Sequence, residues 1–275
     1  MKASAIQMVS NADLSANLLA AERLLREAAR QGAVLAVLPE NFAFMGAHER
    51  DKLAHAEAPG GGPIQAFLSA ITRELELTVV AGTIPLAAPA QPGKVLAACL
   101  VFEAHGKCVA HYDKVHLFDV DVLHADGRRE SYRESSSIAQ GAIEPVVVAT
   151  TAGMVGLSVC YDLRFPELYR ALVARGAQVL SVPSAFTART GEAHWETLLR
   201  ARAIENLAYV IAPGQSGMHP GGRATHGHSM IVDPWGRVLA SLPAGEGVVT
   251  VELDLAQQAQ TRAAFPVLQH RRISC

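Results

Sequence analysis

Three side chains suited to covalent chemistry each follow a strand-like segment of the sequence. Glu40 follows the apolar run AVLAVLP, Lys114 follows KCVAHYD, and Cys160 ends the run MVGLSVC. In α/β proteins, reactive groups tend to lie where strands end at the carboxyl edge of a sheet. An acid, a cation and a thiol brought to such an edge are the groups that cleavage of an amide through a covalent intermediate requires.

The three groups would divide the work between them. A free thiol has a pKa of about 8.5, so only a few per cent of it is thiolate at neutral pH. Glu40 would take the proton from Cys160 as the sulfur attacks, and the Lys114 ammonium would hold the oxyanion. Glu40 would then pass the proton to departing ammonia, and water would attack the thioester. Taken separately, Glu40 and Lys114 are also typical of surface charges, and Cys160 of a metal ligand or a small buried side chain.

Other functional classes find less support in the sequence. Of the eleven histidines, His226 and His228 have a spacing that can ligate a metal, but the chain has no H-E-x-x-H motif. A serine hydrolase requires G-x-S-x-G, and GLSVC (156–160) fails at its last position. A formal charge of −2 without a basic stripe does not indicate a nucleic-acid binder. A non-catalytic binding protein stays an alternative, because a fold does not fix a function.

Strand-like and helical segments alternate along the chain and must position these residues. Apolar runs predict strands at 2–9, 33–38, 77–84, 95–102, 107–112, 145–150, 154–159, 177–182, 207–212, 228–233, 237–241 and 247–252. Amphipathic spacing predicts helices at 13–31, 63–76, 166–175 and 192–206. The number of predicted strands is larger than one ordinary open sheet holds. We therefore expect an α/β fold of two packed mixed sheets flanked by helices.

Length and composition are those of a globular chain with a full core. The 275 residues are 50% hydrophobic and 18% charged, without a linker, so residues 1–275 are expected to form one domain. Neither a signal peptide nor an apolar run of about 20 residues is evident, which favours a cytoplasmic protein with reduced thiols. Cys99 and Cys108 are expected to be packing residues, and Cys275 a frayed terminal thiol.

The motifs around the reactive residues resemble the catalytic motifs of the nitrilase, or carbon–nitrogen hydrolase, superfamily. They are LPENF (38–42), YDKVHLFD (112–119) and VCYDLRFPEL (159–168), in the order of that family. The similarity continues through residues 183–206, 227–240 and 265–272 and so covers nearly the whole chain. The branch that the sequence resembles most is that of the deaminated glutathione amidases, with the omega-amidases as close relatives. The resemblance implies a four-layer αββα sandwich and no metal or organic cofactor.

Carried over to this sequence, the resemblance assigns a role to each reactive residue. Glu40 becomes the general base and acid, Lys114 the stabiliser of the tetrahedral intermediate, and Cys160 the acylated nucleophile. A second glutamate often supports the site in this family, and YRESSSIAQG places Glu134 there. The preceding RRES offers Glu130 in the same local context, so both glutamates are candidates.

The resemblance also indicates where a substrate would bind. Arg164 follows the nucleophile by four residues and is expected to clamp a substrate carboxylate. A salt bridge with Glu167 or another nearby acid is the alternative. Thr190 matches a position that lines the same pocket in relatives, and the backbone N–H of Tyr161 would donate to the oxyanion. The segment 123–131 is longer and more polar than the usual loop of the family, which leaves the rim of the pocket undecided.

The function implied is hydrolysis of the terminal amide of a small carboxylated α-keto amide. Deaminated glutathione is favoured as substrate, because PSAFTARTGEAHWE, GQSGMHP and LQHRR resemble the glutathione-directed branch. An omega-amidase acting on α-ketoglutaramate is the first alternative, followed by an aliphatic amidase, an N-carbamoyl hydrolase or a nitrilase. A metallohydrolase would be a different class. The expected partners are a small-molecule amide and further copies of the chain in a homodimer or larger homo-oligomer, with no nucleic acid and no membrane.

Overall fold

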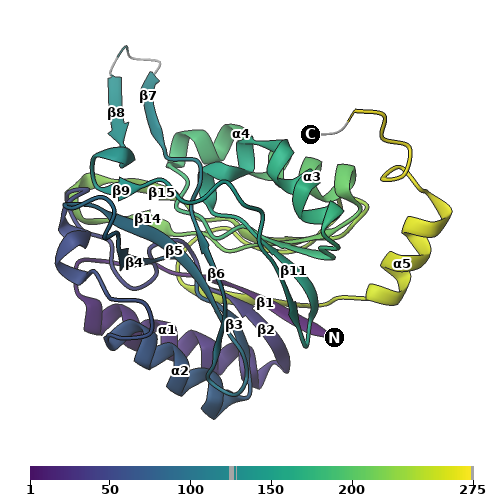
Figure 1. Cartoon of the computed structure of the whole chain (residues 1–275), viewed down its shortest axis with the longest axis horizontal. Helices are drawn as coiled ribbons and strands as arrows, with labels where there is room; N and C mark the ends of the chain where they lie inside the picture. The colour runs from purple at the N-terminus through teal and green to yellow at the C-terminus, as the bar shows by residue number, and fades with distance from the viewer. Residues whose placement is uncertain (124–126, 128, 274–275) are drawn as a thin grey trace.

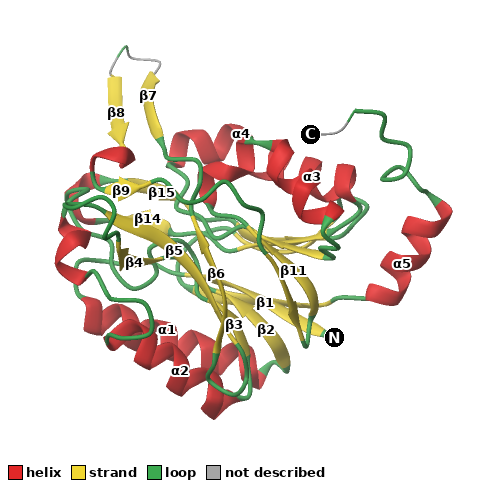
Figure 2. Cartoon of the chain, in the orientation of Figure 1, coloured by secondary structure: helices red, strands yellow, loops and turns green. Residues whose placement is uncertain are grey.

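The computed structural model describes residues 1–123, 127 and 129–273 of the chain. Within these residues, the strands form a mixed eight-stranded sheet, a mixed six-stranded sheet and two separate two-stranded pairs. Figures 1 and 2 show the strands of the two large sheets as inner layers, with helices on the outside.

The first sheet runs in the order β18-β1-β2-β3-β5-β4, and β6 and β9 also pair with β5. Its strands are β1 (Lys2–Gln7), β2 (Ala33–Val37), β3 (Thr78–Val80), β4 (Ile84–Ala87), β5 (Val95–Phe102), β6 (Cys108–Asp113), β9 (Ile138–Ala139) and β18 (Gly247–Glu252). The second sheet runs in the order β10-β11-β12-β13-β16-β17. Its strands are β10 (Val147–Thr150), β11 (Gly153–Leu157), β12 (Val179–Ser181), β13 (Tyr209–Ala212), β16 (Ser229–Val232) and β17 (Val238–Leu242).

Two helices cover the outer face of each large sheet. The helices are α1 (Leu14–Arg30) and α2 (Pro63–Leu75) on the first sheet, and α3 (Pro166–Ala174) and α4 (Ala188–Asn206) on the second. In α1 the apolar positions recur with helical spacing, so that Ala21, Leu24, Leu25 and Ala28 are all buried against the sheet. The order helix, sheet, sheet, helix confirms the expected αββα sandwich.

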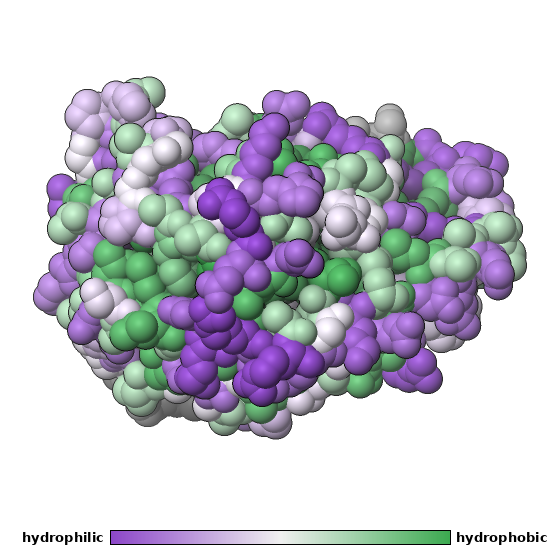
Figure 3. All heavy atoms as spheres, turned by 90° about the horizontal axis from the view of Figure 1, so that it is seen from below, coloured by the Kyte–Doolittle hydropathy of each residue, from purple (hydrophilic) through white to green (hydrophobic). Residues whose placement is uncertain are grey.

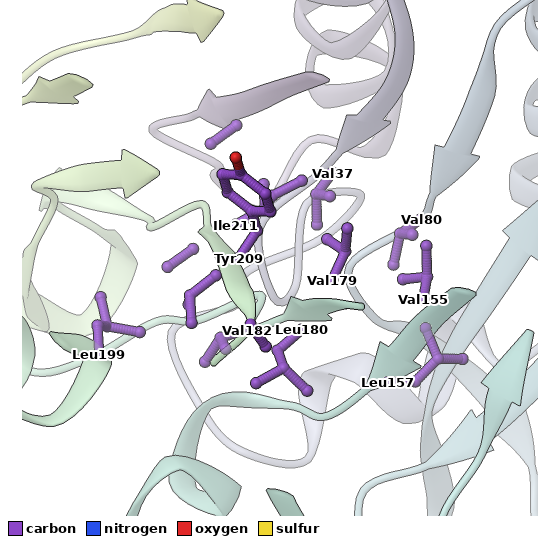
Figure 4. Packing of buried hydrophobic residues seen from close by; sticks show 14 of the residues in the cluster. Val37, Val80, Val155, Leu157, Val179, Leu180, Val182, Leu199, Tyr209 and Ile211 are labelled. Atoms are coloured by element: carbon purple, nitrogen blue, oxygen red, sulfur yellow. The ribbon is translucent and has the colours of Figure 1, made fainter. Parts of the chain in front are cut away.

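The strands fill both sides of each sheet because successive side chains point to opposite faces. Val37 of β2 belongs to the core between the two sheets, whereas the preceding Ala36 belongs to the core beneath α1 and α2. Figure 4 shows Val37 and Val80 of the first sheet facing Val179 and Val155 of the second. The sheets are therefore held together by interlocking apolar side chains.

The outer face of the α1–α2 layer is mixed in polarity. Figure 3 shows hydrophilic residues as a broad band across this face, with hydrophobic residues on either side. Arg26 of α1 donates to Glu22 one turn earlier and to Glu74 of α2, at 2.7–3.0 Å. In the described part of the chain, no helix has the length and apolar character needed to cross a membrane.

The segment 77–84, predicted as one strand, is divided between β3 and β4. Gly82 lies between these strands with a φ of +52°, a conformation that costs glycine little. A Cβ atom at this position would overlap the carbonyl oxygen of Pro39, the residue before Glu40. The single-strand prediction is wrong because the chain must bend here to pass close to the end of β2.

The cysteines and α4 differ from expectation in two details. Cys99 is buried in β5 as predicted, but Cys108 is exposed, because it opens the edge strand β6 directly after a turn. Cys275 lies outside the described residues. Helix α4 begins four residues before the predicted 192, because the Thr187 side chain accepts a hydrogen bond from the Thr190 N–H and caps the helix there.

Several elements lie outside the predicted set. They include α5 (Leu255–Ala264), the short strand β9, the pair β7 (Asp119–Leu123) and β8 (Arg129–Arg133), and the pair β14 (Ser216–Met218) and β15 (Ala224–His226). β7 and β8 form a hairpin that projects from the body of the molecule (Figure 1). Of the loop expected at 123–131, residue 123 belongs to β7 and residues 129–131 belong to β8, while residues 124–126 and 128 lie outside the described part.

Candidate active site

The nucleophile candidate sits in a strained turn at the end of a buried strand. Cys160 follows β11 by three residues and opens the short 3₁₀ helix η3 (Cys160–Arg164). Its φ is +49°, a left-handed conformation that is uncommon for a residue other than glycine. The Cys160 N–H donates to the Pro183 carbonyl at 2.9 Å, which holds the turn against the loop after β12. Such backbone strain is often found at functional sites.

Glu40 and Lys114 meet at the same place from the other sheet. Glu40 follows β2, Lys114 follows β6, and Lys114 Nζ lies 2.8 Å from Glu40 Oε1. The Ala185 N–H donates to Glu40 Oε2 at 2.9 Å, so both oxygens of this buried carboxylate have a partner. The structure therefore brings together the acid, the cation and the thiol predicted from the sequence, although they come from two different sheets.

The structure places Glu134 rather than Glu130 beside Lys114. Both Glu134 carboxylate oxygens lie 2.8 Å from Lys114 Nζ, and Oε2 also accepts the Phe118 N–H at 2.6 Å. Glu130 lies instead in a neighbouring groove, where it hydrogen-bonds to Tyr132. Lys114 is thus held between two carboxylates, which fixes the direction of its side chain.

The charges in the site set the resting protonation states. Burial opposes ionisation of Glu40, but the charge and hydrogen bond of Lys114 outweigh it and hold the Glu40 pKa below its ordinary value. Burial, and then the Glu40 charge, raise the pKa of the Cys160 thiol well above its ordinary value. Although Lys114 is buried, the charges of Glu134 and Glu40 raise its pKa well above the ordinary value. The resting site is therefore a thiol, a carboxylate and an ammonium.

A buried carboxylate fixes the turn that carries Cys160. Asp162 is fully buried and accepts hydrogen bonds from the Tyr112 hydroxyl (2.7 Å), the Val159 N–H (2.8 Å), the His116 N–H (3.1 Å) and His116 Nδ1 (2.7 Å). These contacts join η3 to the segment after β6, which carries Lys114. Asp162 is therefore a positioning residue between the nucleophile and the cation.

The reactive groups open onto one pocket of about 480 Å³. Tyr161, Arg164 and Thr190, the three predicted binding residues, all line it. Tyr161 lies in the first turn of η3, where backbone N–H groups have no acceptor within the helix, so this N–H is available to an oxyanion. The Thr190 hydroxyl is 2.8 Å from the Thr187 hydroxyl at the start of α4.

Over the part of the chain that the structure describes, Arg164 does not form the salt bridge with Glu167 that the sequence offered as an alternative, and it contacts other residues instead. Its guanidinium nitrogens lie 3.3 Å from His194 Nδ1, and the group lies over the rings of Tyr161 and Phe186. Among the described residues, no ion pair between Arg164 and Glu167 is formed. The cation therefore faces the pocket without a carboxylate partner of its own among these contacts.

Comparison with known proteins agrees with this geometry. A family model described as carbon–nitrogen hydrolase matches residues 2–263. The chain belongs to the carbon–nitrogen hydrolase family. It is accordingly an amidase-type hydrolase that acts on carbon–nitrogen bonds other than peptide bonds.

Individual members of the family resemble the chain over nearly its whole length. The deaminated glutathione amidase of Synechocystis is 46% identical over 270 residues, which are 98% of this chain and 97% of the relative. The human deaminated glutathione amidase is 41% identical, over 97% of this chain and 80% of its own length. The crystal structure of the Caenorhabditis elegans NitFhit protein superposes with a TM-score of 0.90 at 37% identity and 98% coverage of this chain. This chain spans 65% of the NitFhit chain.

His226 and His228, whose spacing could ligate a metal, are not arranged as metal ligands in the structure. The rings of His226 and His228 stack face to face with centroids 4.4 Å apart. Among residues 1–123, 127 and 129–273, no group of three His, Cys, Asp or Glu side chains is placed to hold a metal ion. Burial, followed by the charge of His228, lowers the pKa of His226 to about 4.

Several residues that line the pocket were not found from the sequence, among them Glu49, Lys52 and Arg223. Arg223 lines the pocket, donates to the Ala185 carbonyl at 3.1 Å, and lies 3.7 Å from Glu49. It stands alone in a glycine-rich segment, HPGGRATH, which matches none of the motifs used above. Arg223 is recognised as part of the pocket only in the structure, where it contacts Ala185, whose N–H binds Glu40.

Proposed function

We propose that this carbon–nitrogen hydrolase cleaves deaminated glutathione through a thioester on Cys160. The observation that carries the proposal is the meeting of the Cys160 thiol, the Glu40 carboxylate and the Lys114 ammonium in one buried pocket. The substrate follows from the relatives that bear this name at 41–46% identity. Deaminated glutathione is a 2-oxoglutaryl group joined by an amide to cysteinylglycine, and it has a carboxylate at each end.

The first half of the reaction forms the thioester. Cys160 Sγ attacks the amide carbon while Glu40 accepts the thiol proton, which is a transfer between groups that already share a hydrogen bond. Lys114 Nζ, together with the Tyr161 N–H, stabilises the oxyanion of the tetrahedral intermediate. The intermediate collapses when the C–N bond breaks and Glu40 gives its proton to the leaving amine.

The second half regenerates the enzyme. Glu40, again a carboxylate, takes a proton from water as that water attacks the thioester carbon. The second tetrahedral intermediate expels the Cys160 sulfur, which recovers the proton from Glu40, and the acyl group leaves as a carboxylic acid that gives its remaining proton to solvent. Glu134 keeps Lys114 charged and oriented in both halves, because its two oxygens hold the ammonium at 2.8 Å.

Arg164 supplies selectivity for the acyl group. Its guanidinium can bind the carboxylate next to the keto group in a bidentate manner. A neutral aliphatic amide offers no such partner and leaves the cation unpaired, which lowers affinity. α-Ketoglutaramate shares the same acyl group and differs only in its leaving group, so it is the second candidate substrate.

A substrate panel tests the proposal. Release of amine or ammonia is measured from deaminated glutathione, α-ketoglutaramate, propionamide and propionitrile. We expect kcat/KM to be highest for deaminated glutathione and lowest for the two uncharged compounds. Arg164→Ala should remove most of the preference for the keto acids. If propionitrile is the best substrate, or if Arg164→Ala leaves the preference intact, the proposal is wrong.

We further propose a cytoplasmic homo-oligomer built from one domain. The free thiols of Cys99, Cys108 and Cys160 fit a reducing compartment. The exposed Trp235 and Phe265, whose rings meet edge to face, fit a contact between copies. Cell fractionation measures the location, light scattering measures the oligomeric state, and the number of unfolding transitions measures the number of domains. A secreted protein, a monomer, or two separate transitions would contradict them.

A further inference from the structure

Two grooves open from the catalytic pocket, and each contains one of its arginines. The first groove is lined by Arg164, Thr190 and His194, together with residues of β7. The second, of about 810 Å³, is lined by Arg223, Glu49 and Lys52, together with residues of β8. The two grooves share no lining residue among the described part of the chain, and the β7–β8 hairpin contributes to both. A substrate that occupies both grooves must therefore pass the nucleophile.

Arg223 is held firmly but keeps hydrogen-bonding capacity. One Nη donates to the Ala185 carbonyl, and the guanidinium lies over the Tyr132 ring, 5.6 Å from its centroid. The other Nη is 3.7 Å from Glu49 Oε1, while Glu49 makes a closer contact of 3.0 Å with Lys52. Nε of Arg223 is buried and has no hydrogen-bond partner among the described residues. A guanidinium has five N–H donors, four of them on its two Nη atoms, and the hydrogen bond to Ala185 uses one of these, so an anion in this groove would find Nη donors available.

The position of Glu40 decides which end of the substrate each groove receives. Glu40 protonates the leaving amine, so the leaving group must lie on the side of the pocket that Glu40 faces. Arg223 is on this side: it contacts the Ala185 carbonyl, the Ala185 N–H binds Glu40, and the Arg223 charge acts on the Glu40 carboxylate. Arg164 instead contacts Tyr161, Phe186 and His194.

We infer that Arg223 binds the carboxylate of the leaving group, while Arg164 binds that of the acyl group. This inference rests on the proposed function and extends it. The two arginines would select an amide with an anionic group on both sides of the scissile bond. Lys52 lies in the same groove as Arg223, where its charge is paired with Glu49. An amide whose leaving group is ammonia gains nothing from Arg223. The site would then distinguish the two substrates, deaminated glutathione and α-ketoglutaramate, only by the leaving group that each carries.

The test compares substrates that differ only in the leaving group. The panel is deaminated glutathione, the same compound with its glycine carboxylate converted to a neutral amide, and α-ketoglutaramate. We expect the wild type to prefer the free acid over the neutral form by about 10- to 100-fold in kcat/KM, the usual worth of hydrogen bonds to a charged group. Arg223→Ala should reduce that preference to less than about threefold. Arg223→Lys should recover part of it.

A matched variant separates this role from a positioning role. Arg164→Ala should lower kcat/KM for all three substrates and leave the ratio of free acid to neutral form within about threefold of wild type. If Arg223→Ala lowers all three rates by one common factor, Arg223 only positions Ala185 and Glu40, and the inference is wrong. If the wild type does not prefer the free acid, the inference fails without any variant. If the wild type hydrolyses none of the three substrates, the proposed function itself fails.

Discussion

At the scale of single residues, Cys160 and Glu40 have opposite protonation preferences in one pocket. The thiol pKa is raised well above its ordinary value and the carboxylate pKa lies below its ordinary value. A preformed thiolate is therefore not the resting state, and the proton moves as the sulfur attacks. Lys114 lies within 2.8 Å of both Glu40 and Glu134, so a stabilising charge is in place before an oxyanion forms.

The pH dependence follows from these directions. In the proposed reaction Glu40 must be ionised to act as a base, and Lys114 holds its pKa below the ordinary value of a carboxyl group, so activity requires only that the pH exceed this lowered value. We expect kcat/KM to be flat through the neutral range and to fall only at acid pH, below the range in which an ordinary carboxyl group titrates. The same group contributes stability above its unfolded pKa, and this contribution is lost as the pH falls through the folded pKa. Circular dichroism at each pH therefore serves as the control. An acid limb near neutrality would show that another group is the base.

Replacement of the cation should act on the transition state. Lys114→Met should lower kcat by about 10²–10³ with a smaller change in KM, which is the usual effect of losing an oxyanion donor. It also leaves the buried Glu40 and the half-buried Glu134 without their counter-ion, so a lower melting temperature is expected. Lys107→Met, at an exposed site outside the pocket, is the control for removal of a lysine. A variant with a raised KM and unchanged kcat would make Lys114 a binding residue.

Sequence motifs predicted the proposed reacting residues better than the residues that hold them in place. Glu40, Lys114 and Cys160 end strands inside recognisable motifs, and the structure brings them together. Glu130 and Glu134 could not be separated, because only the turn at η2 (Glu134–Ser136) decides which carboxylate reaches Lys114. Arg223 carried no local signal, since its place depends on a contact with Ala185, 38 positions away.

At the scale of elements, the short helix η3 depends on one buried carboxylate. Asp162→Ala would leave the Tyr112 hydroxyl and the N–H groups of Val159 and His116 without an acceptor. Each buried unsatisfied group costs about 1–3 kcal/mol, so with three such groups we expect the free energy of unfolding to fall by at least about 3 kcal/mol. Activity should fall as well, because Cys160 loses its fixed turn.

Asp121 offers a matched control in the exposed β7–β8 hairpin. Its carboxylate also accepts several hydrogen bonds, from Arg129, Ser131 and Arg133. Because these partners are exposed and their charges are screened by solvent, Asp121→Ala should cost much less stability than Asp162→Ala. Urea unfolding of both variants measures the difference. Equal losses at the two positions would show that Asp162 has no special role.

Element boundaries were predicted well where the signal is local. Helix α1 begins after Asp13, whose side chain accepts the Ala16 N–H, close to the predicted start. The start of α4 was placed too late, because the cap at Thr187 lies in a segment without apolar periodicity. The sequence pattern did not predict the break between β3 and β4 at Gly82. This break is required by the close approach of Pro39, a tertiary contact that a strand pattern does not contain.

At the scale of the whole molecule, the candidate site is assembled across the contact between the two sheets. Glu40 and Lys114 follow strands of the first sheet, and Cys160 follows a strand of the second. The distance between base and nucleophile is therefore set by the apolar core between the sheets. An αββα arrangement was predictable from the number of strands, but the pairing of strand ends across the two sheets was not.

A cavity in that core should be costly. Leu35 of β2 is fully buried between the sheets, so Leu35→Ala should lower the free energy of unfolding by about 2–5 kcal/mol. Leu19→Ala makes the same chemical change at a side chain that is 67% exposed, and it should change stability by no more than about 0.5 kcal/mol. Thermal unfolding compares the two variants. Similar melting temperatures would mean that the contact between the sheets is loosely packed.

The central claim is that Cys160 carries the acyl group during turnover. The direct measurement is the intact mass of the enzyme quenched in acid during hydrolysis of deaminated glutathione, followed by mapping of the modified peptide. We expect a 2-oxoglutaryl adduct on Cys160, its persistence in Cys108→Ala, which removes an exposed thiol, and its absence together with all turnover in a folded Cys160→Ala. An adduct on another residue, or turnover by Cys160→Ala near the wild-type rate, would contradict the account.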